Sequence, residues 1–193
     1  MLEELRTPRL LLRRWRPDDA IALAPVLEAN VDHLGDWIPR HVSQAAEIPE
    51  LARRLAGFAS AFQADTEWRY GIFALDGLEL LGEASLFPRD ARSRVALVDA
   101  DRAEVGYWLR KDATGRGYAT EATLALLGVA TSVPAFRLVE IRCDSRNVRS
   151  AAVPRRLGFH LGSSPEPSAE GVDGAAGRLQ IWRHMRPFHP GSS

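Results

Sequence analysis

The chain has 193 residues, which is long enough for one domain with a proper hydrophobic core. Apolar residues make up 46% of the chain, charged residues make up 26%, and the formal net charge at pH 7 is +0. The scattered, balanced arginines argue against a nucleic-acid partner. No stretch approaches the ~20 apolar residues of a membrane span, so we expect no membrane partner either.

Residues 1–4 lack the basic start and the apolar run of a secretory signal, which predicts a cytoplasmic protein. Cys143 is the only cysteine, and its place in an apolar strand indicates packing rather than nucleophilic chemistry. No histidine or cysteine cluster has the spacing of metal ligands, so we predict no metal. Residues 1–193 are expected to form a single domain, with a frayed tail at residues 186–193.

The first third of the chain predicts a strand followed by helices. A strand is expected over residues 9–15, and Pro17 precedes a helix that runs from residue 18 or 19 to about residue 29. Residues 31–40 suggest short turns. A further helix begins at Pro49 and carries apolar side chains at helical spacing.

A hairpin follows these helices. Strands over residues 70–75 and 79–87 flank Asp76-Gly77, which is a strong hairpin turn signal. The apolar residues 95–98 are expected to extend a neighbouring strand, and residues 178–185 predict the final strand.

Between these segments, a strand runs into a glycine-punctuated turn that opens a helix. In residues 104–109, Val105, Tyr107 and Leu109 point to one face and Glu104, Gly106 and Trp108 to the other. The turn holds Gly115 and Gly117, and an apolar helical stripe follows at Ala122, Ala125, Leu126, Val129, Ala130 and Val133. Glycines that accept positive φ, together with free N–H groups at a helix start, form a cradle for an anion such as pyrophosphate.

Two other nucleotide-binding motifs fit this turn poorly. The phosphate loop of NTPases needs Lys followed by Ser or Thr after its last glycine, and here Tyr118 and Ala119 follow Gly117. A dinucleotide fingerprint needs a third glycine, where this chain has Thr120, and an acid at a strand end, for which Asp144 is poorly placed.

A second strand leads into a second helix over residues 137–158. Asn147 is placed to cap this helix, and Gly158 is a natural left-handed stop. Pro154 falls inside the helix, where it removes a backbone donor and clashes with the preceding turn. We therefore predict a kink at Pro154.

The order and spacing of these motifs resemble the GNAT superfamily of acyl-CoA-dependent N-acyltransferases. The resemblance rests on Gly-x-Gly-Tyr-Ala-Thr-Glu-Ala at residues 115–122, Asn-x-x-Ser at 147–150 and Leu-Gly-Phe at 157–159. Within the superfamily, residues 7–13 and 33–39 resemble the first strand and the acceptor-pocket loop of the RimJ/RimL-type branch. The implied fold is α/β (α+β): a central mixed, mostly antiparallel twisted sheet of about seven strands, flanked by helices, with splayed central strands.

The resemblance implies an enzyme of the acyltransferase class that transfers acetyl from acetyl-CoA to a primary amine by direct attack, with a general base. The acceptor is left open between a protein N-terminal α-amine and a small molecule such as an antibiotic or a polyamine. A homodimer is also left open. The alternative from another class is a non-catalytic acyl-CoA-binding sensor or interaction protein with the same fold.

The family's geometry assigns the CoA-binding residues. Pyrophosphate is expected in the glycine turn, and the pantetheine arm is expected to pair with the strand at Trp108 and Leu109, where a main-chain N–H polarises the thioester oxygen. The predicted set is Trp108, Leu109, Arg110, Gly115, Arg116, Gly117, Tyr118, Ala119, Thr120 and Asn147.

Two catalytic residues follow from the same resemblance. Glu104 is the first choice for the general base, with an equal alternative in which its carboxylate pairs with an arginine or binds the amine. Ser150 is expected to protonate the departing CoA thiolate, against the alternative of a local hydrogen bond. The predicted acceptor-binding residues are Trp37, Glu83 and Tyr107, of which Glu83 is also the reserve base; Glu166 and Glu170 are further candidate acids.

Overall fold

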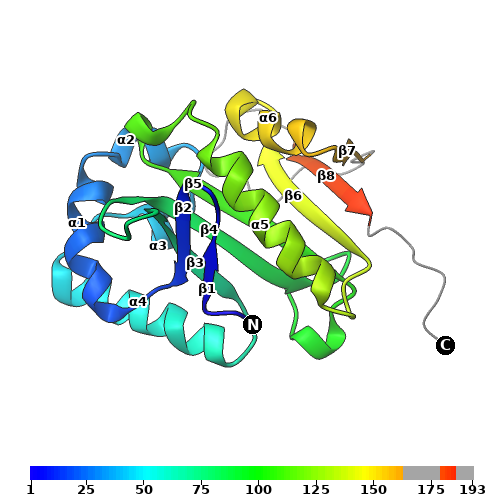
Figure 1. The fold of residues 1–193 in the computed structure, drawn as a ribbon, viewed down its shortest axis with the longest axis horizontal. Coiled ribbons are helices and arrows are strands. Elements are labelled where there is room, and N and C mark those ends of the chain that lie inside the picture. Colours follow the sequence, from blue (N-terminus) through cyan, green and yellow to red (C-terminus); the bar gives the residue numbers. More distant parts are fainter. Residues whose placement is uncertain (163–178, 186–193) are drawn as a thin grey trace.

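The computed structural model describes residues 1–162 and 179–185, which form one sheet flanked by helices (Figure 1). The strands of this part are β1 Glu4–Arg6, β2 Leu10–Arg14, β3 Trp68–Ala74, β4 Leu80–Arg89, β5 Arg102–Leu109, β6 Leu138–Asp144, β7 His160–Leu161 and β8 Leu179–Met185. The helices are α1 Ala20–Glu28, α2 Val31–Gly35, α3 Arg40–Ser43, α4 Ile48–Gln63, α5 Tyr118–Ser132 and α6 Val148–Arg156. Short 3-10 turns cover Pro17–Asp19, Leu97–Asp99 and Lys111–Ala113.

The strand order is β1-β2-β3-β4-β5-β6-β8-β7, and β5 and β6 form the parallel pair in an otherwise antiparallel sheet. Pairing between β5 and β6 runs from Arg102 opposite Leu138 to Val105 opposite Ile141 and then stops. Both strands continue beyond this point, so residues 106–109 and 142–144 lie on separated edges. The predicted splay of the central strands is therefore confirmed.

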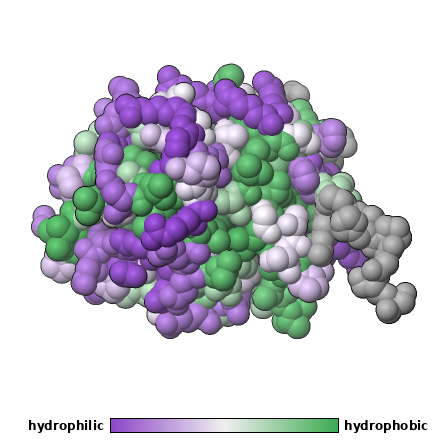
Figure 2. Space-filling model, in the orientation of Figure 1, coloured by the Kyte–Doolittle hydropathy of each residue, from purple (hydrophilic) through white to green (hydrophobic). Residues whose placement is uncertain are grey.

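The helices bury two apolar layers on opposite faces of the sheet. One layer joins α5 and α6 to the face that carries Val105, Ile141 and Phe136. The other joins α1 and α4 to the face that carries Trp15, Phe73 and Trp108. Each large side chain buried in this way contributes about 1.5–3 kcal/mol. Figure 2 shows hydrophobic residues along the outer surface of α5 and hydrophilic residues over the β1–β2 edge.

Most predicted elements are present, and two details differ. The strands predicted at residues 9–15, 70–75, 79–87 and 178–185 appear as β2, β3, β4 and β8, and Gly77 has the positive φ of its turn. The described residues form eight strands rather than about seven, because the short β1 and β7 add to the edges. The prediction of a strand over residues 95–98 was wrong: the chain makes a single bridge from Arg94 to Arg89 and then a 3-10 turn.

The α6 helix runs through Pro154 as far as Arg156. Only two helical residues follow Pro154, and the turn after them closes with a hydrogen bond from the Phe159 N–H to the Pro154 carbonyl, 3.0 Å long. The kink at Pro154 stays a prediction. The predicted frayed tail at residues 186–193 lies outside the described residues. Among the helices of the described part, none is long and apolar enough to span a membrane.

Candidate functional site

The splay leaves one edge of β5 open along residues 106–109. On the other edge β4 pairs with the whole segment, with Gly82 opposite Leu109. The α2 helix lies over the far end of the segment, where the His33 Nε2 atom is 3.2 Å from the Leu109 carbonyl oxygen. Backbone groups on an unpaired strand edge can bind an extended ligand as an added strand.

The glycine turn beyond β5 has the geometry of an anion cradle. Gly115 and Gly117 have φ of 77° and 83°, and Gly117 is the N-cap of α5, where no side chain caps the helix. The N–H groups of the first turn of α5 are therefore left for a ligand. The buried Thr120 Oγ1 atom in this turn has no hydrogen-bond partner. These features fit a pyrophosphate group, and Lys111 and Arg116 add exposed positive charges nearby.

Arg9, which lies just before β2 and which the sequence analysis did not select, contacts the cradle. The Arg9 guanidinium donates to the Arg116 carbonyl (2.9 Å) and to the Glu121 carboxylate (2.7 Å), and it lies 4.8 Å from the centre of the Tyr118 ring. Thr7 Oγ1 also donates to Glu121, at 2.6 Å. The Thr-Pro-Arg start of the resemblance was the available signal, but nothing in it indicated a contact with residues more than a hundred positions away.

Ser150 lies in the first turn of α6, next to the open edge of β5. Asn147 caps this helix, with its Oδ1 atom accepting from the Ser150 N–H at 3.0 Å, as predicted for a cap. The Ser150 hydroxyl is 3.2 Å from the Tyr107 hydroxyl, which donates to the Ser150 carbonyl at 2.9 Å. Burial raises the pKa of Tyr107, so the phenol stays neutral and can donate.

Tyr107 thus lies on the α5 face of the sheet, where it packs against the apolar layer of α5 and α6. Trp108 points to the opposite face and packs in the layer of α1 and α4, and its buried indole N–H has no partner. The two aromatic side chains therefore lie on opposite faces of β5, as the alternation along residues 104–109 predicts. Trp37 lies near the splay, with its ring centre 5.8 Å from the Arg146 guanidinium.

Glu104 is buried among arginines. Its Oε1 atom accepts from Arg94 at 2.7 Å, and its Oε2 atom accepts from Arg89. Both carboxylate oxygens are therefore engaged by guanidinium groups. This geometry favours arginine pairing over general-base catalysis, the two roles that the sequence left equal.

The contacts of Glu83 do not fit the role predicted for it. The Glu83 carboxylate is 3% exposed and accepts from Trp15 Nε1 (2.9 Å), Arg69 (2.8 Å) and Ser85 Oγ (3.0 Å). This buried network occupies Glu83, so the structure argues against a role for it in binding the acceptor or as the reserve base.

Arg110 forms ion pairs with Glu79 and Asp112, the latter at 2.7 Å, so its charge is already compensated within the protein. Burial raises the pKa of the Cys143 thiol, which agrees with a packing role. Glu166 and Glu170 lie outside the described residues. Among the described residues, no group of three or more acidic, histidine or cysteine side chains could hold a metal ion.

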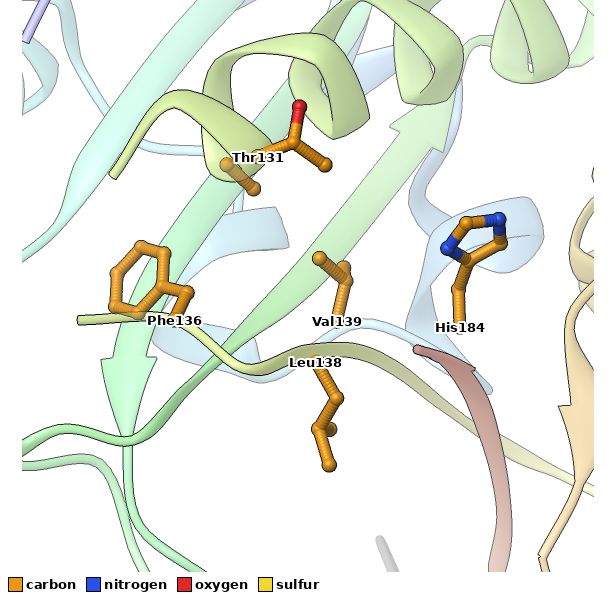
Figure 3. A pocket seen from close by; sticks show the side chains of 6 residues that line it. Thr131, Phe136, Leu138, Val139 and His184 are labelled. Carbon is orange, nitrogen blue, oxygen red and sulfur yellow. The ribbon is translucent and has the colours of Figure 1, made fainter. Parts of the chain in front are cut away.

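Two hollows lie away from the splay. A crevice between α5, β6 and β8 (Figure 3), lined by Ala130, Thr131, Phe136, Leu138, Val139 and His184, has no volume that a water molecule could occupy. A groove of about 790 Å³ lies between α1, the β3–β4 turn and residues 110–112, on the outer side of β4. Neither is lined by the open edge of β5 or by Ser150.

Comparison with known proteins identifies the family to which this chain belongs. Residues 9–160 match the family model described as an acetyltransferase (GNAT) domain. YdaF of Bacillus subtilis (strain 168), which is provisionally named a ribosomal N-acetyltransferase, is 31% identical over 152 residues, covering 78% of this chain and 77% of that protein.

Solved structures share the fold at lower identity. RimL, described as a ribosomal L7/L12 alpha-N-protein acetyltransferase in complex with coenzyme A, superposes with a TM-score of 0.80 at 23% identity, covering 95% of this chain and 98% of that one. The microcin C7 self-immunity acetyltransferase MccE, in complex with acetyl-CoA and AMP, gives a TM-score of 0.77 at 18% identity and covers 93% of each chain.

Proposed function

Because the chain belongs to the GNAT acetyltransferase family, in its RimJ/RimL-type branch, we propose that it transfers the acetyl group of acetyl-CoA to the α-amine of a protein N-terminus. The observation that carries this proposal is the open edge of β5 at residues 106–109, which runs from Ser150 towards the glycine cradle. The names of YdaF and RimL support a protein acceptor over a small molecule. A cytoplasmic location and a homodimer stay predictions.

The cradle and the open strand edge divide the binding of acetyl-CoA between them. The first-turn N–H groups of α5 and the Thr120 hydroxyl bind the pyrophosphate, and the pantetheine amides pair with the backbone of residues 106–109. A backbone N–H at Tyr107, next to Ser150 and farther from the cradle than the predicted Leu109, then faces the thioester oxygen and stabilises the negative charge that develops on it during attack.

Ser150 and Tyr107 handle the leaving group. As the amine nitrogen forms its bond to the acetyl carbon, the C–S bond breaks and the sulfur leaves as a thiolate. The Ser150 hydroxyl donates a proton to the thiolate and takes back the proton that the attacking nitrogen releases, so serine ends neutral and CoA leaves as the thiol. The Tyr107 phenol oxygen, 3.2 Å from Ser150 Oγ, accepts from that hydroxyl before the donor binds and holds it beside the strand edge. Ser150 therefore acts as the general acid and Tyr107 as its positioning residue.

An intact cap at Asn147 and the Ser150–Tyr107 pair favour an enzyme over a non-catalytic sensor. A sensor needs only the cradle and the open strand edge. A hydroxyl pair held beside that edge is of use only when a leaving group has to be protonated.

Measuring the release of free CoA distinguishes the protein acetyltransferase from a small-molecule acetyltransferase and from a non-catalytic sensor. The purified chain is incubated with acetyl-CoA and, in turn, with N-terminal peptides, polyamines and aminoglycoside antibiotics, while free CoA is measured. We expect release with peptides and a peptide mass increase of one acetyl group at the α-amine. Release with small amines alone would assign a small-molecule acceptor, and tight binding of acetyl-CoA without any release would assign a sensor.

A further inference from the structure

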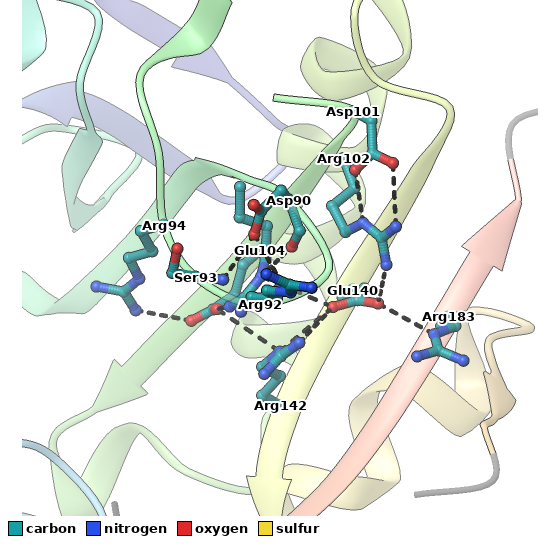
Figure 4. A network of polar contacts seen from close by, with 11 residues as sticks. Asp90, Arg92, Ser93, Arg94, Asp101, Arg102, Glu104, Glu140, Arg142 and Arg183 are labelled. Atoms are coloured by element: carbon teal, nitrogen blue, oxygen red, sulfur yellow. Dashed lines mark hydrogen bonds and ion pairs between the residues drawn. The ribbon is translucent and has the colours of Figure 1, made fainter. Parts of the chain in front are cut away.

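A cluster of arginines and glutamates lies on the sheet face that carries Glu104, where β5 and β6 begin to separate (Figure 4). We call it the arginine cluster; its members are Arg89, Arg94, Arg102, Glu104, Glu140, Arg142 and Arg183. They come from β4, the loop after it, β5, β6 and β8. The cluster is therefore assembled from five separate segments of the chain.

The cluster carries more positive than negative charge. Five guanidinium groups surround the carboxylates of Glu104 and Glu140, and one of them, Arg102, also pairs with Asp101 at 2.7 Å. Two positive charges thus remain in excess. The whole chain has a formal net charge of +0, so this excess is a local feature.

The excess charge reaches the surface at both ends of the cluster. The side chains of Arg94 and Arg183 are 48% and 39% exposed, whereas Glu104 and Glu140 are 10% and 0% exposed. Figure 4 shows Arg94 and Arg183 on opposite sides of the two buried carboxylates. Each exposed guanidinium therefore has N–H donors that face solvent rather than a protein acceptor.

This face is the side from which an acceptor can approach. Tyr107, α5 and α6 occupy the other face of the splay. On the face of the arginine cluster, the described helices α1 and α4 pack against β3 and β4 rather than against β6. A peptide whose amine meets the thioester near Tyr107 therefore runs past Arg142, the first residue of β6 beyond its last pair with β5.

Strand geometry sets the register of that path. Arg142 follows Ile141, whose partner is Val105, so it lies level with Gly106, about 3 Å along the strand from Tyr107 at 3.3 Å per residue. Glu104 lies about 10 Å from Tyr107 on the same scale. An extended acceptor peptide advances by about 3.3–3.6 Å per residue, so its residues 2–4 pass over the arginine cluster when residue 1 reacts.

Resting on the proposed function, we infer that the arginine cluster selects protein N-termini that carry aspartate or glutamate at positions 2–4. Carboxylates of the acceptor bind the free donors of Arg94 and Arg183, while Glu104 and Glu140 hold the guanidinium groups in place. Arg94 and Arg183 each use one nitrogen to pair with a buried carboxylate, which leaves their other N–H donors for a ligand.

The test uses three dodecapeptides with the same first residue. One has acidic residues at positions 2–4, the second has the same composition with the acidic residues moved to positions 10–12, and the third has glutamines at positions 2–4. We expect kcat/KM for the first peptide to exceed that for the other two by about tenfold, the effect of one charge-assisted hydrogen bond. The advantage is expected to shrink as salt is added.

The variant Arg94→Gln/Arg183→Gln is expected to abolish this preference and to change kcat/KM for the glutamine peptide by less than about twofold. The matched control is Arg6→Gln, an exposed arginine of β1 that pairs with Glu4 and lies far along the sheet; it is expected to keep the preference. Thermal stabilisation by acetyl-CoA checks that each variant is folded.

Equal kcat/KM for the three peptides, or a preference that survives in the double variant, would overturn the inference. Binding of fluorescently labelled peptides in the presence of CoA gives a second measurement that needs no turnover. If no peptide is acetylated, the proposed function fails, whereas tighter binding of the first peptide by the wild type alone would still support the inference.

Discussion

Single residues in the central strands are placed by charge as much as by packing. Glu140 is 0% exposed on β6, yet it accepts hydrogen bonds from Arg102 (3.1 Å), Arg142 (3.0 Å) and Arg183 (3.0 Å). A buried carboxylate on a central strand is stable only with such partners. Burial alone would raise the pKa of Glu140, but the hydrogen bonds from Arg183 and Arg142 lower it below its ordinary value.

Replacement of Glu140 tests whether its arginine partners offset the cost of burying its charge. Glu140→Gln leaves buried guanidinium groups without a counter-charge, so the free energy of unfolding at pH 7 should fall by about 3–5 kcal/mol in urea titrations. Because the folded pKa is lowered, the stabilisation is present above the ordinary value of 4.5 and is lost as the pH falls through the folded pKa. The gap between variant and wild type should therefore narrow in acid. Glu4→Gln, at an exposed pair with Arg6, should cost at most about 1 kcal/mol.

Replacement of Glu104 separates its two candidate roles. If the carboxylate anchors Arg89 and Arg94, Glu104→Gln should destabilise the fold by about 3 kcal/mol or more and change kcat by less than about tenfold. If it is the general base, kcat should fall by about 10²–10⁴ and the acidic limb of the pH–rate profile should disappear. We expect the first result, measured by urea unfolding and steady-state kinetics together.

Replacement of Ser150 tests the leaving-group acid. Ser150→Ala keeps the backbone N–H that donates to Asn147, so the helix cap and the melting temperature should be unchanged. Loss of the hydroxyl should lower kcat by about 10²-fold with little change in the KM for acetyl-CoA. Ser60→Ala in α4, where the hydroxyl donates to its own helix at Ala56, is the matched control and should leave kcat unaltered. An unchanged kcat in Ser150→Ala would contradict the assignment.

At the level of elements, β5, the glycine turn and α5 form one unit that combines a strand edge with a helix N-terminus. Gly117 ends the turn in the left-handed region, with φ of 83°, and caps α5. A Cβ atom there would lie 3.4 Å from the Arg9 guanidinium that supports the cradle. Gly117 therefore provides the left-handed backbone conformation of the turn and leaves room for the Arg9 side chain that contacts it.

A pair of glycine substitutions on this helix tests the cradle. Gly117→Ala should cost about 1–2 kcal/mol in stability and raise the Kd for CoA, because the strained backbone shifts the N–H groups. Gly128→Ala lies within the same helix with nothing within 4 Å of the new Cβ, so it should add about 0.5–1 kcal/mol and leave the Kd unchanged. Calorimetric titration with CoA and thermal unfolding measure both effects. Equal Kd values for the two variants would argue against pyrophosphate binding at Gly117.

At the scale of the whole molecule, the sheet joins two apolar layers, and the proposed ligand site lies where its central strands separate. A ligand that bridges β5 and the start of α5 couples these parts, and ligand binding to the folded state alone stabilises it by about 2.7 kcal/mol at a hundred times Kd. For a chain of this size we expect acetyl-CoA to raise Tm by about 5–10 °C. Pantetheine, which lacks the pyrophosphate, should give a smaller shift in the same thermal scan.

Features that depend on neighbouring residues could be predicted from the sequence. The hairpin at Asp76 and Gly77, the cap at Asn147 and the turn at Gly115 and Gly117 each lie within a short segment whose backbone preferences are local. The strand at residues 95–98 was predicted wrongly from apolar content alone, because a short apolar run does not show whether a partner edge is free.

Charge partners could not be predicted in this way. Glu140 and Arg142 alternate with Val139 and Ile141 along β6, and this alternation gives the face of the sheet on which they lie but not their charge partners. The partners of Glu140 come from β5 and β8, and those of Glu104 come from β4 and the loop after it. Register between strands decides such pairs, and it depends on the packing of the whole sheet.

The sequence by itself therefore determined the local conformation of the proposed donor site, because the glycine turn, the helix start and the capped serine lie in continuous segments with local conformational rules. Only the tertiary structure decided what surrounds Glu104 and on which face of the sheet the arginine cluster lies. Coulombic pairing acts through space between residues far apart in the chain, so the arginine cluster exists only once five segments have been brought together by the sheet.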